Sequence, residues 1–300
     1  MNILIRRSNL LVRLADTEGV ESAWRHNADA ITLDLDGADD GARGRVREAI
    51  VKASRGAAEV FVKADQEILR SDLECAVAPG LRGIVLNGAD TAAQVQAADE
   101  SVTALEAQRG LPRGSLQLVV VIGSAAGVWD VRAIVQASPR ISQVFLDEAA
   151  LAANLGISAL PELDPFDYAR GRVIVEAIAA KVMPVGIAYP LSVHADAASP
   201  EDIHALAVKG RNLGFKGVLC PEPSWVEPAN RAFTPTPQLV IYNKRVREAF
   251  AAGVAAGTAA VPLDGRMIDV PVDEWAIVVL ATADACAARD AEKRAALARL

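Results

Sequence analysis

Short β-rich runs alternate with helical segments over most of this 300-residue chain. Each run is aliphatic or β-branched and ends at turn residues, and the eight are Asn9–Leu14, Ile31–Asp36, Glu59–Ala64, Gly83–Asn87, Gln117–Ile122, Gln143–Leu146, Met183–Tyr189 and Gly217–Cys220. Segments with helical spacing lie between them, among them Asp40–Ala53, Ala92–Gln108, Val128–Ala137, Asp167–Lys181 and Pro200–Leu213. The alternation predicts right-handed βαβ units, whose parallel strands are buried on both faces.

Eight such units predict an α/β fold, the (β/α)8 TIM barrel. An open doubly wound sheet is the alternative that the same alternation allows. We expect the barrel to span residues 1–235, and residues 236–300 to form a C-terminal helical extension. This extension has helical segments at Gln238–Ala255 and Val272–Leu300, with a loop at Gly257–Pro271 between them. Because so short a stretch cannot bury a core of its own, we expect it to pack, as a lid, on the barrel or on a neighbouring subunit.

The composition of the chain and the distribution of its charges argue against several classes of protein. The chain has 31 basic and 38 acidic residues, a net charge of −7 and only 4% aromatic residues, which argues against a nucleic-acid partner. No uncharged apolar run is long enough to span a membrane. The first residues interrupt their apolar stretch with arginines, unlike a secretory signal. Three widely spaced cysteines fit a reducing compartment, so we expect a cytoplasmic protein.

Charged residues stand at the ends of two neighbouring predicted strands. In a TIM barrel the loops after the strands form the active site. The two-residue period of a strand places Asp34 and Asp36 on one face of the second strand, and Lys63 and Asp65 on one face of the third. Because a bare buried charge is costly, we predict an ion pair between Lys63 and Asp36 at the barrel mouth. Such a pair could belong to an active site, or it could be a structural salt bridge at the rim of the barrel.

The fifth strand is followed by a glycine-containing turn, residues 123–127. A strand-to-helix turn of this kind can present backbone N–H groups to an anion. Gly123 and Ser124 are therefore candidate substrate-binding residues, together with Lys63 and Asp36. Turns of this composition are also common as plain connections. No G-x-S-x-G motif surrounds Ser124, which argues against a hydrolase triad.

Several segments resemble, in order, the citrate lyase β-subunit-like branch of the HpcH/HpaI aldolase family. In the first half of the chain they are Arg7-Ser8, Leu10-Leu11-Val12, residues 28–36 (ADAITLDLD) and residues 79–86 (PGLRGIVL). In the second half they are residues 126–128 (AGV), 151–157 (LAANLGI), 213–221 (LGFKGVLCP), 229–235 (ANRAFTP) and 263–272 (LDGRMIDVPV). The resemblance covers nearly the whole chain.

The resemblance implies a TIM barrel that forms a homotrimer or a higher homo-oligomer, with the C-terminal segment of one subunit covering the site of its neighbour. Members of the family make or break C–C bonds in 3-hydroxyacyl-CoA thioesters such as malyl-CoA or citramalyl-CoA, and some hydrolyse the thioester. A Mg²⁺ ion held by a Glu and an Asp binds the keto-acid oxygens. An arginine on the third strand clamps the carboxylate, and a lid aspartate moves the proton. The partner implied is thus a small acyl-CoA or keto acid, with CoA as the substrate carrier.

This sequence departs from the family pattern at the metal. The metal-binding Glu falls on Gly123, and the metal-binding Asp falls on Ala150. Neither side chain offers the oxygen that Mg²⁺ requires, so we expect no metal site of the usual kind. Asp147 and Glu148 are the two carboxylates nearby in the sequence that could rebuild one.

Two other positions of the family pattern keep a charged side chain. The family's arginine becomes Lys63, which retains the charge but loses the bidentate fork, and the lid aspartate is retained as Asp269. Lys63 could act electrostatically or as a Schiff base, and the carboxylates of Asp36 and Asp65 beside it favour the charged amine and the electrostatic role.

Three functions remain open from the sequence. The first is a C–C lyase of the family's class in which Lys63 replaces the metal and Asp269 moves the proton. The second is a non-catalytic or assembly homologue that has lost lyase activity. The third is thioester hydrolysis, which needs only an activated water and Asp269.

Overall fold

A computed structural model of the chain describes residues 3–194 and 198–299. The chain forms two compact units. One is a barrel unit that spans Arg6–Phe233, and the other is a C-terminal unit built mainly from Thr234–Ala295. No helix in the described part of the chain is long and apolar enough to cross a membrane.

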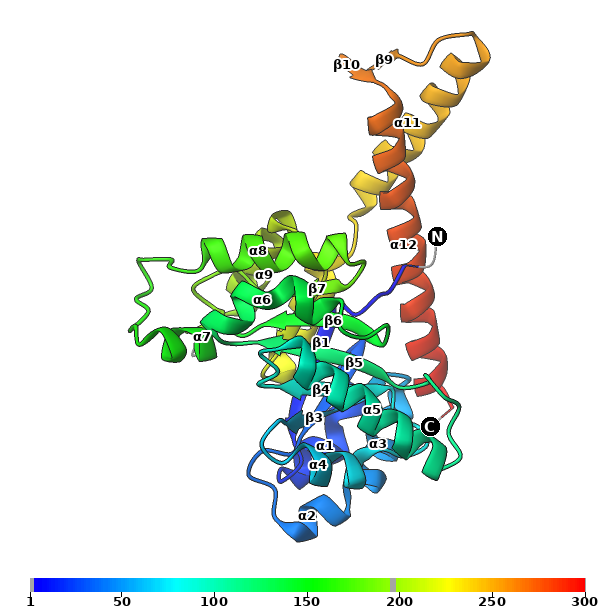
Figure 1. Ribbon diagram of the computed structural model, residues 1–300. Helices are drawn as coiled ribbons and strands as arrows, with labels where there is room; N and C mark the ends of the chain where they lie inside the picture. Colours follow the sequence, from blue (N-terminus) through cyan, green and yellow to red (C-terminus); the bar gives the residue numbers. More distant parts are fainter. Residues whose placement is uncertain (1–2, 195–197, 300) are drawn as a thin grey trace. The chain divides into compact units, whose positions relative to one another are not determined.

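Eight parallel strands form the sheet of the barrel unit (Figure 1). They are β1 (Ser8–Arg13), β2 (Ala30–Asp34), β3 (Glu59–Asp65), β4 (Gly83–Asn87), β5 (Gln117–Ile122), β6 (Ile141–Leu146), β7 (Met183–Val185) and β8 (Val218–Cys220). Each strand from β1 to β6 pairs with the next, and β8 pairs with β1. A parallel bridge between Val185 and Gly217 links β7 to the start of β8. This sequential order confirms the predicted (β/α)8 barrel, since a doubly wound sheet would reverse its strand order.

Helices surround the strands of the barrel unit (Figure 1). They are α1 (Thr17–Ser22), α2 (Asp40–Gly44), α3 (Val46–Ala53), α4 (Leu69–Ala76), α5 (Ala92–Gln108), α6 (Ala125–Val135), α7 (Glu148–Leu155), α8 (Asp167–Ala179), α9 (Pro200–Leu213) and α10 (Val226–Phe233). The single helix predicted at Asp40–Ala53 is wrong, because the chain breaks at Arg45 into α2 and α3. Gly41 and Gly44 weaken the helix just before this break.

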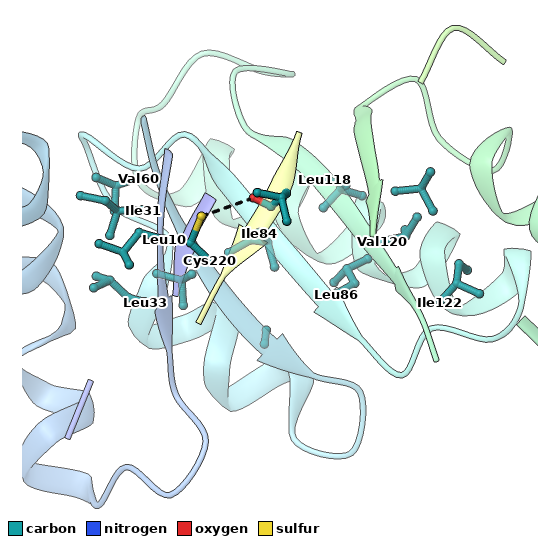
Figure 2. Close-up of a cluster of buried hydrophobic side chains, with 14 of the residues drawn as sticks. Leu10, Ile31, Leu33, Val60, Ile84, Leu86, Leu118, Val120, Ile122 and Cys220 are labelled. Carbon is teal, nitrogen blue, oxygen red and sulfur yellow. Dashed lines mark hydrogen bonds between the residues drawn. The ribbon is translucent and has the colours of Figure 1, made fainter. Parts of the chain in front are cut away.

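Alternate residues of each strand face opposite sides of the barrel wall. The outward-facing side chains pack against the helices, and Figure 2 shows Leu10, Ile31, Leu33, Val60, Ile84, Leu86, Leu118, Val120, Ile122 and Cys220 among them. A separate cluster fills the barrel interior and consists of Ala30, Phe61, Val85, Val119, Val121, Phe145, Met183 and Val185. Both faces of every strand are therefore buried, as expected for a parallel barrel.

Residues from the first and later segments of the family resemblance meet at the start of β1. Arg7 donates hydrogen bonds from its backbone N, Nε and Nη2 to the carboxylate of Asp29, at 2.9, 2.8 and 2.9 Å. Ser8 Oγ donates to Asn230 Oδ1 at 2.8 Å. All four side chains are buried. These hydrogen bonds link β1 to α10 and to Asp29, the residue before β2. Their role in this structure is to stabilise the barrel.

Strand β7 is shorter than predicted. The run Met183–Tyr189 was expected to be one strand, but β7 ends at Val185. Ile187 and Tyr189 are buried in the outer core but do not pair in the sheet. Their burial explains the apolar pattern that predicted a longer strand.

The C-terminal unit contains α11 (Pro237–Ala255), β9 (Val261–Leu263), β10 (Arg266–Ile268) and α12 (Val270–Leu297). The expectation of a plain loop at Gly257–Pro271 is wrong, since β9 and β10 pair there as an antiparallel hairpin. Val246 of α11, Ile268 of β10 and Ala276 of α12 form its small buried cluster.

A buried carboxylate on α5 makes the barrel unit sensitive to acid. Burial alone would raise the pKa of Glu106, but hydrogen bonds from Arg140 and from the backbone N–H groups of Leu116 and Gly114 lower it to about 2. A lowered pKa stabilises the fold above the unfolded-state value of about 4.3, and this contribution is lost as the pH falls toward 2.

Glu106→Gln is therefore expected to cost about 2–3 kcal/mol of unfolding free energy at pH 7 and to flatten its dependence on pH between pH 5 and 2. Urea unfolding across this range measures both effects. Glu100→Gln, an exposed residue of the same helix, is the matched control. Equal pH dependence in the two variants would contradict the assignment.

Candidate active site

A cavity of about 290 Å³ lies at the carboxyl ends of the barrel strands. Its apolar wall consists of Leu11, Val85, Val121, Phe145, Leu146, Ala149, Val185, Ile187, Leu191, Val193, Val218, Leu219, Pro221 and Trp225. Five polar residues also line it, namely Thr32, Lys63, Asn87, Asp147 and Ser192. This end of a TIM barrel carries the active site in characterised enzymes, so the cavity is the candidate site.

Lys63 is the one cationic side chain among the residues that line this cavity. Its Nζ donates to Asp34 Oδ2 at 3.0 Å. The predicted partner, Asp36, is wrong, because the parallel register places Asp34 directly opposite Lys63. Asp36 lies two residues beyond the end of β2, is exposed, and donates its backbone N–H to Asp34 Oδ1 at 3.1 Å.

A second cavity of about 270 Å³ adjoins the same lysine and is acidic. The carboxylates that line it belong to Asp34, Asp36, Asp65, Glu67 and Asp72. Arg43 lines it too, and its guanidinium is paired with Asp72. Lys63 and Asn87 line both cavities and thus stand between the apolar and the acidic side of the mouth. Asn87 Nδ2 donates to Asp65 Oδ2 at 3.3 Å, which fixes the amide there.

Gly123 and Ser124, predicted to bind substrate, do not line either cavity. Ser124 Oγ donates to Asp90 Oδ1 at 2.6 Å and accepts from the backbone N–H of Gly127 at 2.9 Å, so it caps α6. The backbone N–H of Ala125 donates to a side-chain oxygen of Asn154. Two of the N–H groups expected to hold an anion are therefore already used within the fold.

The two positions of the family's metal ligands face each other directly. A Cβ atom built on Gly123 would lie 2.8 Å from the Cβ of Ala150. Asp147 Oδ1 accepts the backbone N–H of Ala150 at 2.9 Å and so caps α7. Among residues 3–194 and 198–299, no group of three or more His, Cys, Asp or Glu side chains could hold a metal ion. At this corner Gly123 and Ala150 themselves provide no side-chain oxygen, and Asp147 uses one carboxylate oxygen for the cap.

Glu148, the other carboxylate predicted as an alternative metal ligand, belongs to a buried polar cluster. Arg170 donates to Glu148 Oε1 at 2.6 Å and to Asp164 Oδ1 at 2.6 Å. Ser192, which lines the cavity, donates its hydroxyl to Glu148 Oε2. Burial raises the pKa of Glu148 above its ordinary value, and the hydrogen bonds from Arg170 and Ser192 oppose that rise. The cluster holds the loop after β7 against α7 and α8.

Asp269, predicted to move the proton, lies in the C-terminal unit between β10 and α12. It is exposed, and its Oδ1 accepts the backbone N–H of Val272 at 3.3 Å. Its catalytic role stays a prediction.

Three residues at the mouth, Asp34, Ser192 and Trp225, were not among the predicted site residues. Asp34 was assigned to the correct strand face, and the strand register would have identified it as the partner of Lys63. Ser192 and Trp225 lie on connections after β7 and β8, where no periodic pattern marks them. Their place in the wall depends on tertiary contacts alone.

The direct contact between positions 123 and 150 gives a test of this corner. Gly123→Ala is expected to cost about 1–3 kcal/mol, because its new methyl group would overlap that of Ala150. Adding Ala150→Gly removes the overlap, so Gly123→Ala should cost less in that background than in the original chain. Thermal and urea unfolding of the two single variants and the double variant measure this coupling. Additive effects would show that the two positions do not touch.

The model of the HpcH/HpaI aldolase/citrate lyase family matches residues 7–223 of this chain. The citrate lyase β subunit of Escherichia coli K12 is 29% identical over 293 residues, which cover 95% of each chain. The L-malyl-CoA/β-methylmalyl-CoA lyase of Rhodobacter capsulatus is 29% identical over 210 residues, 64% of each chain.

Solved structures share the fold. A citrate lyase from Burkholderia xenovorans LB400 has a TM-score of 0.74 at 15% identity, covering 94% of this chain and 92% of its own. CitE from Mycobacterium tuberculosis, in complex with magnesium, acetoacetate and coenzyme A, has a TM-score of 0.67 at 21% identity, covering 92% of this chain and 97% of its own. With a family model that matches well over half of its length, the chain belongs to the HpcH/HpaI aldolase/citrate lyase family.

Proposed function

We propose that this protein is a C–C lyase for a small CoA-linked hydroxy acid, and that it works with Lys63 as its cation in place of Mg²⁺. The observation that carries the proposal is the position of Lys63. Its ammonium group, oriented by Asp34 at 3.0 Å, lines a cavity at the carboxyl ends of the strands. The Gly123 and Ala150 positions offer no side-chain oxygen for a metal.

The substrate class is inferred from the relatives. Their names describe citrate lyase β subunits and an L-malyl-CoA/β-methylmalyl-CoA lyase, and one neighbour of similar fold was solved with acetoacetate and coenzyme A. The names are those of lyases of small acids, and malyl-CoA is such an acid carried as a CoA thioester. The cavity in this chain is of a size for such an acyl group.

The proposed reaction needs a cation and a proton acceptor. A base takes the proton of the substrate's 3-hydroxyl group, and the C2–C3 bond breaks as the hydroxyl carbon becomes a carbonyl. The electron pair of that bond moves to the thioester carbonyl to give an enolate, which is protonated at carbon. The ammonium of Lys63 binds the carboxylate of the keto-acid part and so fixes the breaking bond in place. We propose Asp269 as the residue that moves the proton.

Product analysis of the purified chain tests this function. Malyl-CoA and citramalyl-CoA are incubated with the protein, and the products are separated by chromatography and identified by mass. Release of a shorter acyl-CoA together with a keto acid is the expected result. Release of free CoA with the acid intact would instead identify a thioesterase. No turnover and no binding of either compound would leave a non-catalytic homologue.

The assembly and location of the chain stay predictions. We propose the homotrimer and the cytoplasmic location that the family resemblance and the cysteine usage imply, with the C-terminal extension as its lid.

A further inference from the structure

The cavity has an uneven distribution of polar groups. Most of its wall is aliphatic or aromatic, with Phe145, Val121, Val185 and Leu219 contributed by three neighbouring strands and by β8. Phe145, Val121 and Val185 are also part of the packed barrel interior, so the wall is a rigid surface. An apolar wall of this kind favours an apolar ligand group by removing its surface from water.

The cavity has a single positive charge for an anionic ligand. Among the residues that line it, Lys63 is the one cation, and its carboxylate partner Asp34 leaves the remaining ammonium hydrogens for a ligand. Arg43, the other cation at the mouth, lies in the acidic cavity and is paired with Asp72. A second carboxylate on the ligand would find no second cation among the residues that line the cavity, and a place against the apolar wall or beside the carboxylate of Asp147 would be costly.

Three of the remaining polar side chains already make hydrogen bonds within the protein. The Ser192 hydroxyl donates to Glu148, and the Asn87 amide donates to Asp65. Asp147 uses one oxygen to cap α7. The hydroxyl of Thr32 also lines the cavity, and the hydrogen bonds that the cavity offers suit one carboxylate and the adjacent carbonyl.

We propose that the keto-acid part of the substrate is a monocarboxylate with a short, branched aliphatic side group, and not a dicarboxylate. The carboxylate would pair with Lys63, and the aliphatic group would lie against Val121, Phe145 and Leu219. A water-sized group occupies roughly 30 Å³ in the liquid, so a cavity of this volume takes on the order of ten non-hydrogen atoms. This inference rests on the proposed function, whose site it specifies further.

Titration calorimetry with a series of 2-oxo acids tests the substrate class. The series is glyoxylate, pyruvate, 2-oxobutanoate and 3-methyl-2-oxobutanoate, with oxaloacetate and 2-oxoglutarate as dicarboxylates, each with and without acetyl-CoA. Each added carbon buried against the wall is expected to tighten binding about fourfold. The dicarboxylates are expected to bind at least about tenfold more weakly than 3-methyl-2-oxobutanoate.

A wall variant separates the apolar contact from the charge. Leu219→Asn changes a partly buried wall residue to a polar one of similar shape and should reduce the gain per carbon to less than about twofold. Leu213→Asn, the same change at an exposed position of α9, is the matched control. If Leu219→Asn fails to fold, the ligand series on the unaltered protein still decides the question.

The outcomes distinguish the two claims. If the 2-oxo acids bind but oxaloacetate or glyoxylate binds as tightly as 3-methyl-2-oxobutanoate, the substrate class is wrong and the keto-acid site stands. If none of these acids binds, with or without acetyl-CoA, both the proposed function and the proposed substrate class are wrong.

Discussion

Lys63→Met is expected to lower kcat/KM for thioester cleavage by about 10²–10³-fold, if the protein cleaves the substrate as proposed. Methionine has a similar length but no charge, so the variant cannot bind the substrate's carboxylate or stabilise negative charge beside it. A loss of 10²–10³-fold is typical when an enzyme loses one preorganised donor that stabilises charge in the transition state. Steady-state cleavage kinetics, with kcat and KM determined separately, measure the effect.

Two further variants show whether the loss is chemical or structural. Lys63→Met leaves Asp34, which is 6% exposed, without its cation, and this alone will lower stability. Adding Asp34→Asn should restore much of the stability but none of the activity. Lys63→Arg keeps the charge and should retain activity within about tenfold. A Lys63→Met protein that is folded and cleaves at the original rate would exclude Lys63 from the reaction.

Arg170→Met is expected to cost about 3–5 kcal/mol of unfolding free energy, a large part of a typical domain's stability. Arg170 is 2% exposed and pairs with Glu148, which is also 2% exposed, and with Asp164. Removing the guanidinium leaves the Glu148 carboxylate buried without a cation. Urea unfolding measures the loss, and Arg70→Met, which breaks a surface pair with Glu74, should cost less than about 1 kcal/mol.

The Arg170→Met deficit should depend on pH. Burial raises the pKa of Glu148, and in the variant no guanidinium opposes it. A raised carboxyl pKa favours the fold at low pH, and this contribution is lost as the pH rises through the folded-state value. The deficit should therefore be smaller at pH 5 than at pH 8. A deficit that is equal at the two pH values would show that Glu148 does not carry it.

The order of the barrel strands was predictable from the sequence, because each buried run is bounded by turn residues and separated by a helical segment. Runs such as 83–87 and 117–122 match their strands residue for residue. The prediction of β7 failed because Ile187 and Tyr189 are buried in the outer core without a ladder partner. The hairpin at Val261–Ile268 was not predicted because its strands are too short to show a period.

The site was predictable only in part. Lys63 was correctly placed at the mouth by strand alternation, but its pairing with Asp34 depends on the register between β2 and β3. The cavity wall was not foreseen, because Val121 and Phe145 have the same sequence signature as any core residue. The bond from Ser192 to Glu148 joins residues 44 positions apart, and no local pattern reports such a contact.

The dependence of cleavage on metal shows whether Lys63 acts in place of Mg²⁺. Cleavage of malyl-CoA or citramalyl-CoA is followed with an excess of EDTA and then across a titration with Mg²⁺. We expect the same rate at every magnesium concentration, because Gly123 and Ala150 provide no side-chain ligand and Lys63 supplies the charge in the proposed reaction. Cleavage that is absent in EDTA and restored by Mg²⁺ would contradict this expectation.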